Sequence, residues 1–362
     1  MVVVVLALVG GVGGGLVELS ARHRYDLAAQ QLGTLIDQVQ GVDSQRATQV
    51  TSASAVASAA AGITKIDATG FVDAVAATAL ASDLPALTSA LSDASKPLEA
   101  PARPEGPSSL WPPTLDAATR HVQAQVDDLT TRLHAAKRQI SALAAASTKV
   151  TADRDAVLAS VALVSAQVDS ANDIATNDAR FAFEDAAADA VPSADDPAGA
   201  LATYVDAGHG LVASQAAEQA ELAGALHDNR VAIEQFARSI DGGVRLDFNW
   251  KPTLTFDGNT WGTGGTFAGW TEFWFSRGGY ATISLTDSVA VYWPDTRALV
   301  VHEVGHAIST KCENMAPHET RAEAEAWAVA WAISMGYTGD GNGANIYGTP
   351  PASLVQAASA CR

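Results

Sequence analysis

The sequence predicts an α+β protein in which a long helical region precedes a smaller mixed domain. Residues 1–240 are rich in Ala, Gln, Asp and Ser and hold 7 of the 23 aromatic residues, whereas 241–362 hold the other 16. Hydrophobic residues make up 48% of the chain, which is enough to bury a core and excludes wholesale disorder. The formal charge of −18 repels phosphate backbones and excludes nucleic acid as a partner.

Residues 1–19 form an apolar run with no charged residue before Glu18. At 1.5 Å per residue such a helix just crosses a hydrocarbon layer of ~30 Å. We expect a signal sequence or transmembrane anchor, and therefore a secreted protein or one held at the cell membrane with its C-terminal domain outside the cytoplasm. Arg22 and Arg24 favour the opposite orientation by the positive-inside rule, so topology stays open, and a buried core helix is the alternative.

Residues 20–96 are predicted to be helical, because Leu32, Leu35, Ile36 and Val39 recur at helical spacing. The proline-rich segment 97–113 predicts a linker or a long bend between helices.

A heptad pattern then starts at Val122 and continues to Val168, within a long helical or coiled-coil region at 114–240 that residues 192–199 interrupt. One interpretation is a rod for self-association or partner binding. The other is an antiparallel hairpin packed on residues 20–95.

The segment 241–362 changes period and predicts a small globular domain. Polar and apolar residues alternate at 244–248, which is typical of a half-buried strand. Ile283 and Leu285, then Val289 and Val291, alternate around Asp287-Ser288 and predict a hairpin or two short strands. The Gly- and aromatic-rich stretch between them forms either core or the wall of a groove.

The segment HEVGH at 302–306 carries the chemistry. Asp295 is the expected N-cap of its helix. His302 and His306 are four residues apart, so both imidazoles lie on one face and can bind one Zn²⁺ at ~2.0–2.1 Å. Glu303 is beside them and can reach a metal-bound water as general base without being a ligand.

This motif resembles that of the HExxH zinc metallopeptidases, the zincins, over residues 295 to about 330. Residues 319–323 (ETRAE) look like the second active-site helix of the glutamate-ligand branch, the gluzincins. The resemblance implies that Glu319 is the third metal ligand and that Glu323 orients a ligand histidine by a hydrogen bond.

Two other assignments of the third ligand stay open. Glu323 can be the ligand instead, or Cys312 can be, since it holds the last position of the metzincin pattern HExxHxxGxxH. Glu325 is expected to be solvated. The 12 residues between His306 and Glu319 make a tight connection between two helices.

Cys312 and Cys361 are expected to form a disulfide that ties this connection to the C-terminal end, with two buried thiols as the alternative. A disulfide requires an oxidising compartment. Candidates for holding an oxyanion in the site are His318, Tyr337 and Tyr347.

These observations predict a zinc-dependent metallopeptidase that hydrolyses a peptide or protein substrate with a zinc-activated water. An extended substrate is expected to add to an edge strand formed by part of 281–293. The alternative is a catalytically silent envelope scaffold or adhesion protein with a structural zinc site and a coiled-coil interaction region.

Overall fold

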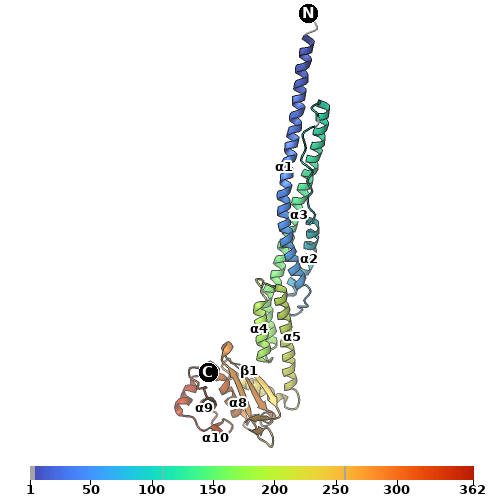
Figure 1. Cartoon of the computed structure of the whole chain (residues 1–362). Helices are drawn as coiled ribbons and strands as arrows, with labels where there is room; N and C mark the ends of the chain where they lie inside the picture. Colours follow the sequence, from blue (N-terminus) through green and yellow to red (C-terminus); the bar gives the residue numbers. More distant parts are fainter. Residues whose placement is uncertain (1–4, 108, 257) are drawn as a thin grey trace. The chain divides into compact units, whose positions relative to one another are not determined.

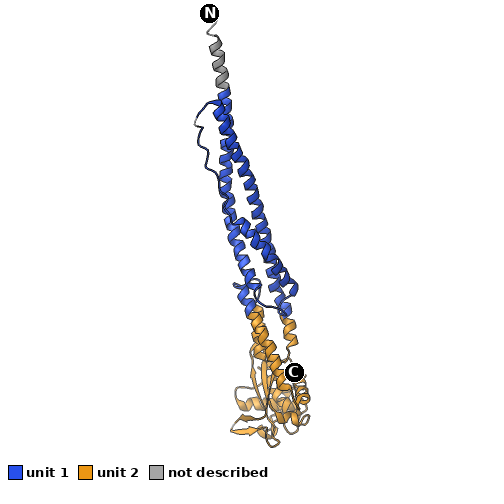
Figure 2. Cartoon of the chain, turned by 90° about the vertical axis from the view of Figure 1, so that its right-hand side faces the viewer, with its two compact units in different colours: residues 1–164, 189–202 blue, residues 165–188, 203–362 orange. Residues whose placement is uncertain are grey.

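The computed structural model describes the backbone of residues 5–107, 109–256 and 258–362, and side chains from residue 17 onward except 108 and 257. The chain divides into two compact units (Figure 2). The first comprises residues 1–164 and 189–202, and the second comprises 165–188 and 203–362. The second unit is therefore larger than the segment 241–362 that composition indicates.

Helices precede a small group of strands, as the sequence predicts, and the α+β class is confirmed (Figure 1). The α-helices are α1 (Val5–Ile63), α2 (Ala74–Ala94), α3 (Pro112–Ala171), α4 (Asn177–Asp189), α5 (Pro197–Leu222), α6 (His227–Arg238), α7 (Asp287–Val291), α8 (Arg297–Ile308), α9 (Arg321–Ser334), α10 (Ala344–Tyr347) and α11 (Ala352–Ser359). The strands are β1 (Arg245–Lys251), β2 (Leu254–Phe256), β3 (Asn259–Trp261), β4 (Gly269–Trp274) and β5 (Tyr280–Thr286), and 3₁₀ turns occupy Ser276–Gly278 and Ser309–Lys311.

In the first unit the heptad stripe of α3 packs within the chain. Its apolar residues between Leu115 and Ile140 share one buried cluster with residues Ala21 to Val42 of α1. The prediction that the stripe packs on residues 20–95 is thus confirmed. The predicted antiparallel arrangement holds for α2, whose Asp73 and Asp83 contact Ser160 and Lys149 of α3, but was wrong for α1, which runs in the same direction as α3 (Figure 1). The return path that makes a parallel pair possible is α2 followed by residues 95–111.

The helical region predicted at 20–96 consists of two helices, α1 and α2, separated by residues 64–73. Gly70 has φ +84°, which favours glycine, and the side chain of Asp73 accepts a hydrogen bond from the N–H of Ala76 at 2.8 Å as the N-cap of α2. Residues 97–113 contain six prolines. The described part of 97–111 accordingly contains no helix, as predicted.

The predicted anchor at 1–19 falls mainly outside the described side chains, although α1 includes its backbone from Val5 onward. Among the described residues, α2 is the one helix whose length and composition suffice to cross a membrane. Leu80 and Leu87 of α2 are nevertheless fully buried in the first unit, and Asp83 forms an ion pair with Lys149 of α3.

The second unit contains a three-stranded sheet in the order β1-β5-β4, with β1 parallel and β4 antiparallel to β5. The strand predicted at 244–248 is confirmed as part of β1, and the one predicted around Ile283 and Leu285 is confirmed as part of β5. The hairpin around Asp287 was wrong, because residues Asp287–Val291 form α7. The edge strand expected within 281–293 was wrong too, because β5 is central and the outer strand on that side is β4.

Helices α8, α9 and α11 and the sheet share one core with α6. Its largest fully buried side chains are Trp327 and Trp331 of α9. The Nε1 of Trp331 donates to the carbonyl oxygen of Cys361 at 3.0 Å, which holds the end of the chain against α9.

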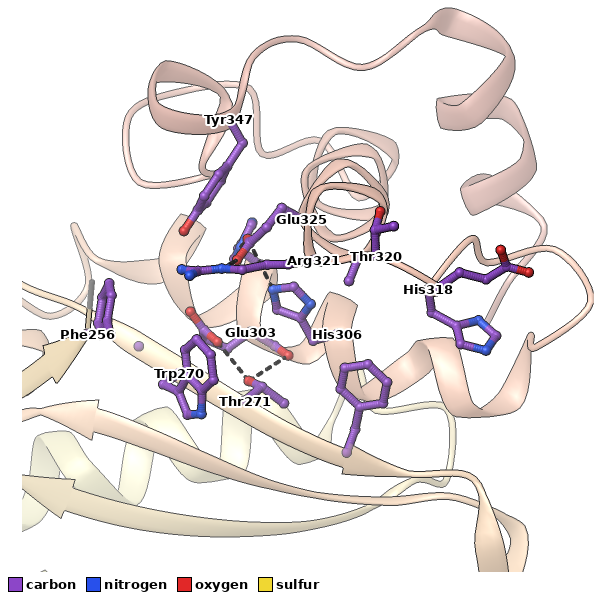
Figure 3. A pocket seen from close by; sticks show the side chains of 15 residues that line it. Phe256, Trp270, Thr271, Glu303, His306, His318, Thr320, Arg321, Glu325 and Tyr347 are labelled. Atoms are coloured by element: carbon purple, nitrogen blue, oxygen red, sulfur yellow. Dashed lines mark hydrogen bonds and ion pairs between the residues drawn. The ribbon is translucent and has the colours of Figure 1, made fainter. Parts of the chain in front are cut away.

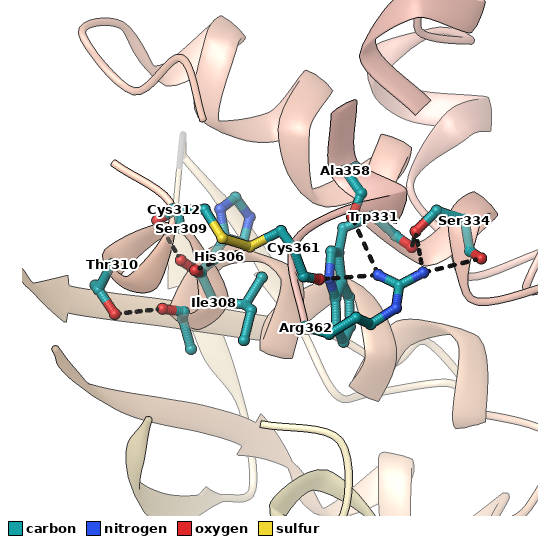
Figure 4. Close-up of a disulfide and its surroundings, with 11 residues drawn as sticks. His306, Ile308, Ser309, Thr310, Cys312, Trp331, Ser334, Ala358, Cys361 and Arg362 are labelled. Carbon is teal, nitrogen blue, oxygen red and sulfur yellow. Dashed lines mark hydrogen bonds between the residues drawn. A yellow bond between two sulfur atoms is a disulfide. The ribbon is translucent and has the colours of Figure 1, made fainter. Parts of the chain in front are cut away.

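Cys312 and Cys361 form a disulfide, as predicted (Figure 4). The bridge joins the turn that follows α8 to the C-terminal end, with the two Cα atoms 6.1 Å apart. Arg362 adds hydrogen bonds to the carbonyl oxygens of Ala358 and Cys361 at 3.0 and 2.9 Å. Together these contacts hold the turn that follows α8 against the C-terminal end of the chain.

We predict that replacing Cys312 and Cys361 together with alanine lowers the free energy of unfolding by about 4 kcal/mol, because the bridge closes a loop of 49 residues in the unfolded chain. Urea unfolding followed by tryptophan fluorescence measures this, since seven of the eight tryptophans lie in 241–362. A reducing agent added to the unaltered chain is the control and should give the same shift. Equal midpoints in all samples would contradict the prediction.

Candidate metal centre

Helix α8 carries the HEVGH segment and is buried on all sides. His302, Glu303 and His306 are 5%, 4% and 9% exposed. Two imidazoles and a carboxylate rarely enter a core unless they bind one another or a ligand. The helix begins at Arg297 after Thr296, whose hydroxyl donates to the carbonyl oxygen of Val289 at 2.8 Å, so Asp295 is not its N-cap.

The third donor beside the histidines is Glu325 of α9. Its Oε2 lies 3.2 Å from Nε2 of His302 and 3.4 Å from Nε2 of His306. One donor atom from each residue lies within 4.8 Å of the other two, and across the described residues this is the one such group of three. All three side chains are buried, so the group can hold a metal ion.

A close crossing of α8 and α9 brings Glu325 to this place. A Cβ on Gly305 would lie 3.0 Å from Cα and 3.1 Å from the carbonyl oxygen of Ala328. Any larger residue at 305 would push the two helices apart. Glu325 is three residues before Ala328 and lies on the same face of α9. The contact between Gly305 and Ala328 therefore also sets how close the carboxylate of Glu325 comes to α8.

The segment before α10 orients the imidazole of His302. Its Nδ1 donates to the carbonyl oxygen of Asn342 at 3.0 Å, which leaves Nε2 without a proton in the neutral ring and directed toward Glu325. Gly343, with φ +87°, lets the backbone pass the ring, since a Cβ there would lie 2.8 Å from Cε1 of His302.

The electrostatics of this group favour a cation. Burial opposes ionisation of Glu325, but hydrogen bonds from the protonated rings of His302 and His306 outweigh it and hold the pKa of Glu325 well below its ordinary value. Burial likewise lowers the pKa of His302, and the hydrogen bond to Glu325 with the charges of Glu303 and Glu325 raises it above the ordinary value overall. The field that stabilises a proton between these side chains also stabilises a metal ion.

Glu303 is held beside the group by strand β4. The hydroxyl of Thr271 donates to its Oε2 at 2.7 Å, and a Cβ on Gly269 would lie 2.5 Å from its Oε1. Glycine at 269 therefore makes room for the carboxylate, and Thr271 fixes its rotation. Figure 3 shows Glu303, His306 and Glu325 pointing into the same pocket.

The structure places the sequence-predicted third ligands elsewhere. Glu319 lines the pocket but is exposed and precedes α9, because Thr320 is the N-cap of that helix. Glu323 completes a capping box, with its Oε2 accepting from the backbone N–H of Thr320 at 3.0 Å. The sulfur of Cys312 is in the disulfide, so it supplies no thiolate.

The expectation that Glu325 is solvated was wrong, since it is 6% exposed. A signal for it was present in the sequence. Ala328, Val329 and Ala332 follow Glu325 at three, four and seven residues, so Glu325 belongs to the apolar stripe of α9. An acidic residue on a stripe that faces the core needs a buried partner.

Of the candidates for binding an oxyanion, Tyr347 lies at the site. Its ring stacks on His302 with centroids 5.9 Å apart, and burial, followed by the charges of Glu325 and Glu303, raises the pKa of its hydroxyl to about 12. His318 lies at the pocket rim, where it packs against Phe275 at 4.5 Å. Tyr337 packs on the hydrophobic core.

The sequence alone assigned no role to Arg321. Among the described residues with a permanent positive charge, it is the one that contacts the three donors. Its Nε lies 3.6 Å from Oε1 of Glu325, the oxygen turned away from the histidines, and its guanidinium stacks over Trp270 at 5.5 Å. Arg321 also lowers the pKa of the Tyr347 hydroxyl, against the larger effect of burial.

Two adjoining cavities meet at Glu303, His302 and Arg321. One of about 250 Å³ extends toward His318 and Glu319 and is polar at that end. The other, of about 480 Å³, is lined largely by apolar side chains, among them Phe256, Trp261, Phe267, Leu299 and Ile346. The donors are thus reachable from two sides.

Comparisons of the chain with protein-family models, curated proteins and solved structures found no match. The resemblance to the zincins therefore rests on the HEVGH and ETRAE segments of the sequence.

We predict that Gly305→Ala lowers the affinity for Zn²⁺ about 10-fold or more, in the range found for residues that support metal ligands, because α9 must move and carry Glu325 with it. Competition with a chelating dye measures the dissociation constant. Gly339→Ala is the matched control, since a Cβ there meets nothing within 4 Å. Equal affinities for the two variants would contradict this account of the helix crossing.

Proposed function

We propose that the protein is a zinc-dependent peptidase that hydrolyses peptide bonds in a protein or peptide substrate. The observation that carries the proposal is the buried group of His302, His306 and Glu325 with Glu303 held beside it. Nothing in a purely structural metal site requires a further carboxylate fixed next to its ligands.

The donor set favours zinc among the common metals. Two imidazoles and one carboxylate, with a position left for water, are the donors of many catalytic zinc sites. Donors that are ~2.0–2.1 Å from a tetrahedral ion lie about 3.4 Å from one another. The distances from Glu325 Oε2 to the two histidine nitrogens, 3.2 and 3.4 Å, agree with that geometry.

Glu303 is the proposed general base. When bound, zinc lowers the pKa of a coordinated water to about 7, within reach of a carboxylate. Oε2 of Glu303 accepts the Thr271 hydrogen bond, so Oε1, against Gly269, is the oxygen that takes the proton and later passes it to the leaving amine.

Arg321 and Tyr347 are proposed to stabilise the charge that develops on the attacked carbonyl oxygen. A fixed guanidinium beside a cation site opposes metal binding, and its pairing with Oε1 of Glu325 offsets only part of that repulsion. An anionic group that appears during the reaction gives the guanidinium a function.

The substrate is proposed to bind as an extended segment along β4. This is one of the two outer strands of the sheet, and Gly269, Trp270 and Thr271 line the polar cavity. Main-chain hydrogen bonds to a strand edge accept many sequences. Selectivity then comes from the 480 Å³ cavity, whose lining suits a bulky apolar side chain next to the cleaved bond.

The disulfide and the apolar helix α2 suggest a membrane or extracellular protein. We propose that residues 1–19 anchor the chain in a membrane and that the metal centre lies outside the cytoplasm.

We predict that Glu303→Gln keeps the metal but abolishes hydrolysis, because the amide cannot accept the proton while its size is unchanged. Metal content by mass spectrometry and cleavage of casein are measured on the same sample. Glu272→Gln, on the same strand as Thr271, is the control and should retain both. Cleavage that survives Glu303→Gln would contradict the role of the base.

We predict that Glu325→Ala lowers Zn²⁺ affinity by more than about 100-fold, which exceeds the loss expected for residues that only support ligands. Glu319→Ala and Glu323→Ala are the matched controls and should change the affinity little, because their carboxylates lie outside the donor group. If either control loses more Zn²⁺ affinity than Glu325→Ala, the substituted residue, Glu319 or Glu323, is the third ligand instead.

A further inference from the structure

The two residues that precede α3 form an exposed apolar pair in the first unit. Leu110 is 45% exposed and Trp111 is 66% exposed. Trp111 is also the one tryptophan outside residues 241–362. Large apolar side chains this exposed indicate a contact surface when they lie together.

Trp111 lies level with the end of the apolar run at 1–19. Arg24 of α1 and Asp116 of α3 form an ion pair at 2.8 Å, and α1 and α3 run in the same direction (Figure 1). Both helices rise about 1.5 Å per residue. Counting five residues back from each partner of the ion pair therefore places Trp111 beside Leu19.

Other contacts hold this segment against α1. Ala21 and Leu115 are fully buried in one cluster, and the hydroxyl of Tyr25 donates to the carbonyl oxygen of Glu105 at 2.5 Å. Leu19 itself is 66% exposed. Leu110 and Trp111 therefore lie beside the exposed Leu19, where the charged residues of α1 begin.

We propose that Leu110 and Trp111 insert into the interface of a lipid bilayer and form a second contact beside the N-terminal anchor. Tryptophan is suited to this depth, because its ring is apolar while its N–H is a hydrogen-bond donor. The inference rests on the anchor proposed above and is independent of the metal centre.

A second copy of the chain is the competing occupant of the pair. A stable protein interface buries about 1,200–2,000 Å² in total, far more than two side chains supply. A bilayer needs no such area, since the apolar run already holds the chain at the membrane and each added side chain only deepens the contact.

The test uses the full chain in vesicles of phosphatidylcholine and phosphatidylglycerol, with bromine near the headgroup end of the acyl chains. Bromine quenches tryptophan fluorescence on contact, so the unaltered chain should lose intensity relative to unbrominated vesicles. Trp111→Phe should remove most of that loss. Trp274→Phe is the matched control, since Trp274 is 40% exposed in the second unit, and should leave the loss unchanged.

Each outcome decides a separate question. Flotation of the vesicles shows whether the chain is bound, and a chain that stays behind overturns both the anchor and the interface. A bound chain that is quenched equally with and without Trp111 overturns the interface alone. If quenching depends on Trp111 only at concentrations where cross-linking yields dimers, the second copy is the occupant and the proposal falls.

Discussion

The close crossing of α8 and α9 at Gly305 is the constraint on which the candidate site depends. A helix of ordinary composition keeps its neighbour 8–10 Å away between axes, and a glycine against Ala328 allows the shorter end of that range. This close crossing lets the carboxylate of Glu325 on α9 meet the two imidazoles that project from α8. Gly305, the fourth position of HEVGH, therefore has a structural role as necessary as that of the histidines.

Other elements hold the polar groups that this crossing assembles. The carbonyl oxygen of Asn342 sets the tautomer of His302, Thr271 of β4 sets the rotation of Glu303, and the disulfide closes the turn after α8. These three contacts come from segments far apart in the sequence. A site held from several sides loses little entropy when a ligand binds, which is what precise placement of a metal and a base requires.

The sequence predicted features that depend on local pattern and missed those set by distant contacts. Heptad spacing correctly identified the buried face of α3, but its direction relative to α1 depends on where α2 ends and could not be read from the pattern. Glu319 was chosen because its segment matches a known motif, whereas Thr320 caps α9 and leaves Glu319 before the helix. Glu325 was identifiable only by asking which acidic residue shares a face with Ala328 and Ala332.

The charges of the site support the proposal of a catalytic centre over that of a purely structural metal site. Glu303 and Glu325 bring two negative charges into a buried region where Arg321 alone among their described partners is permanently positive. Two nearby carboxylates without a cation cost several kcal/mol of folding stability each. A structural zinc site closes with four protein ligands and needs only Glu325 of the pair. Retaining Glu303 as well, oriented by Thr271 and given room by Gly269, destabilises the fold unless its carboxylate acts on something that enters from the cavities.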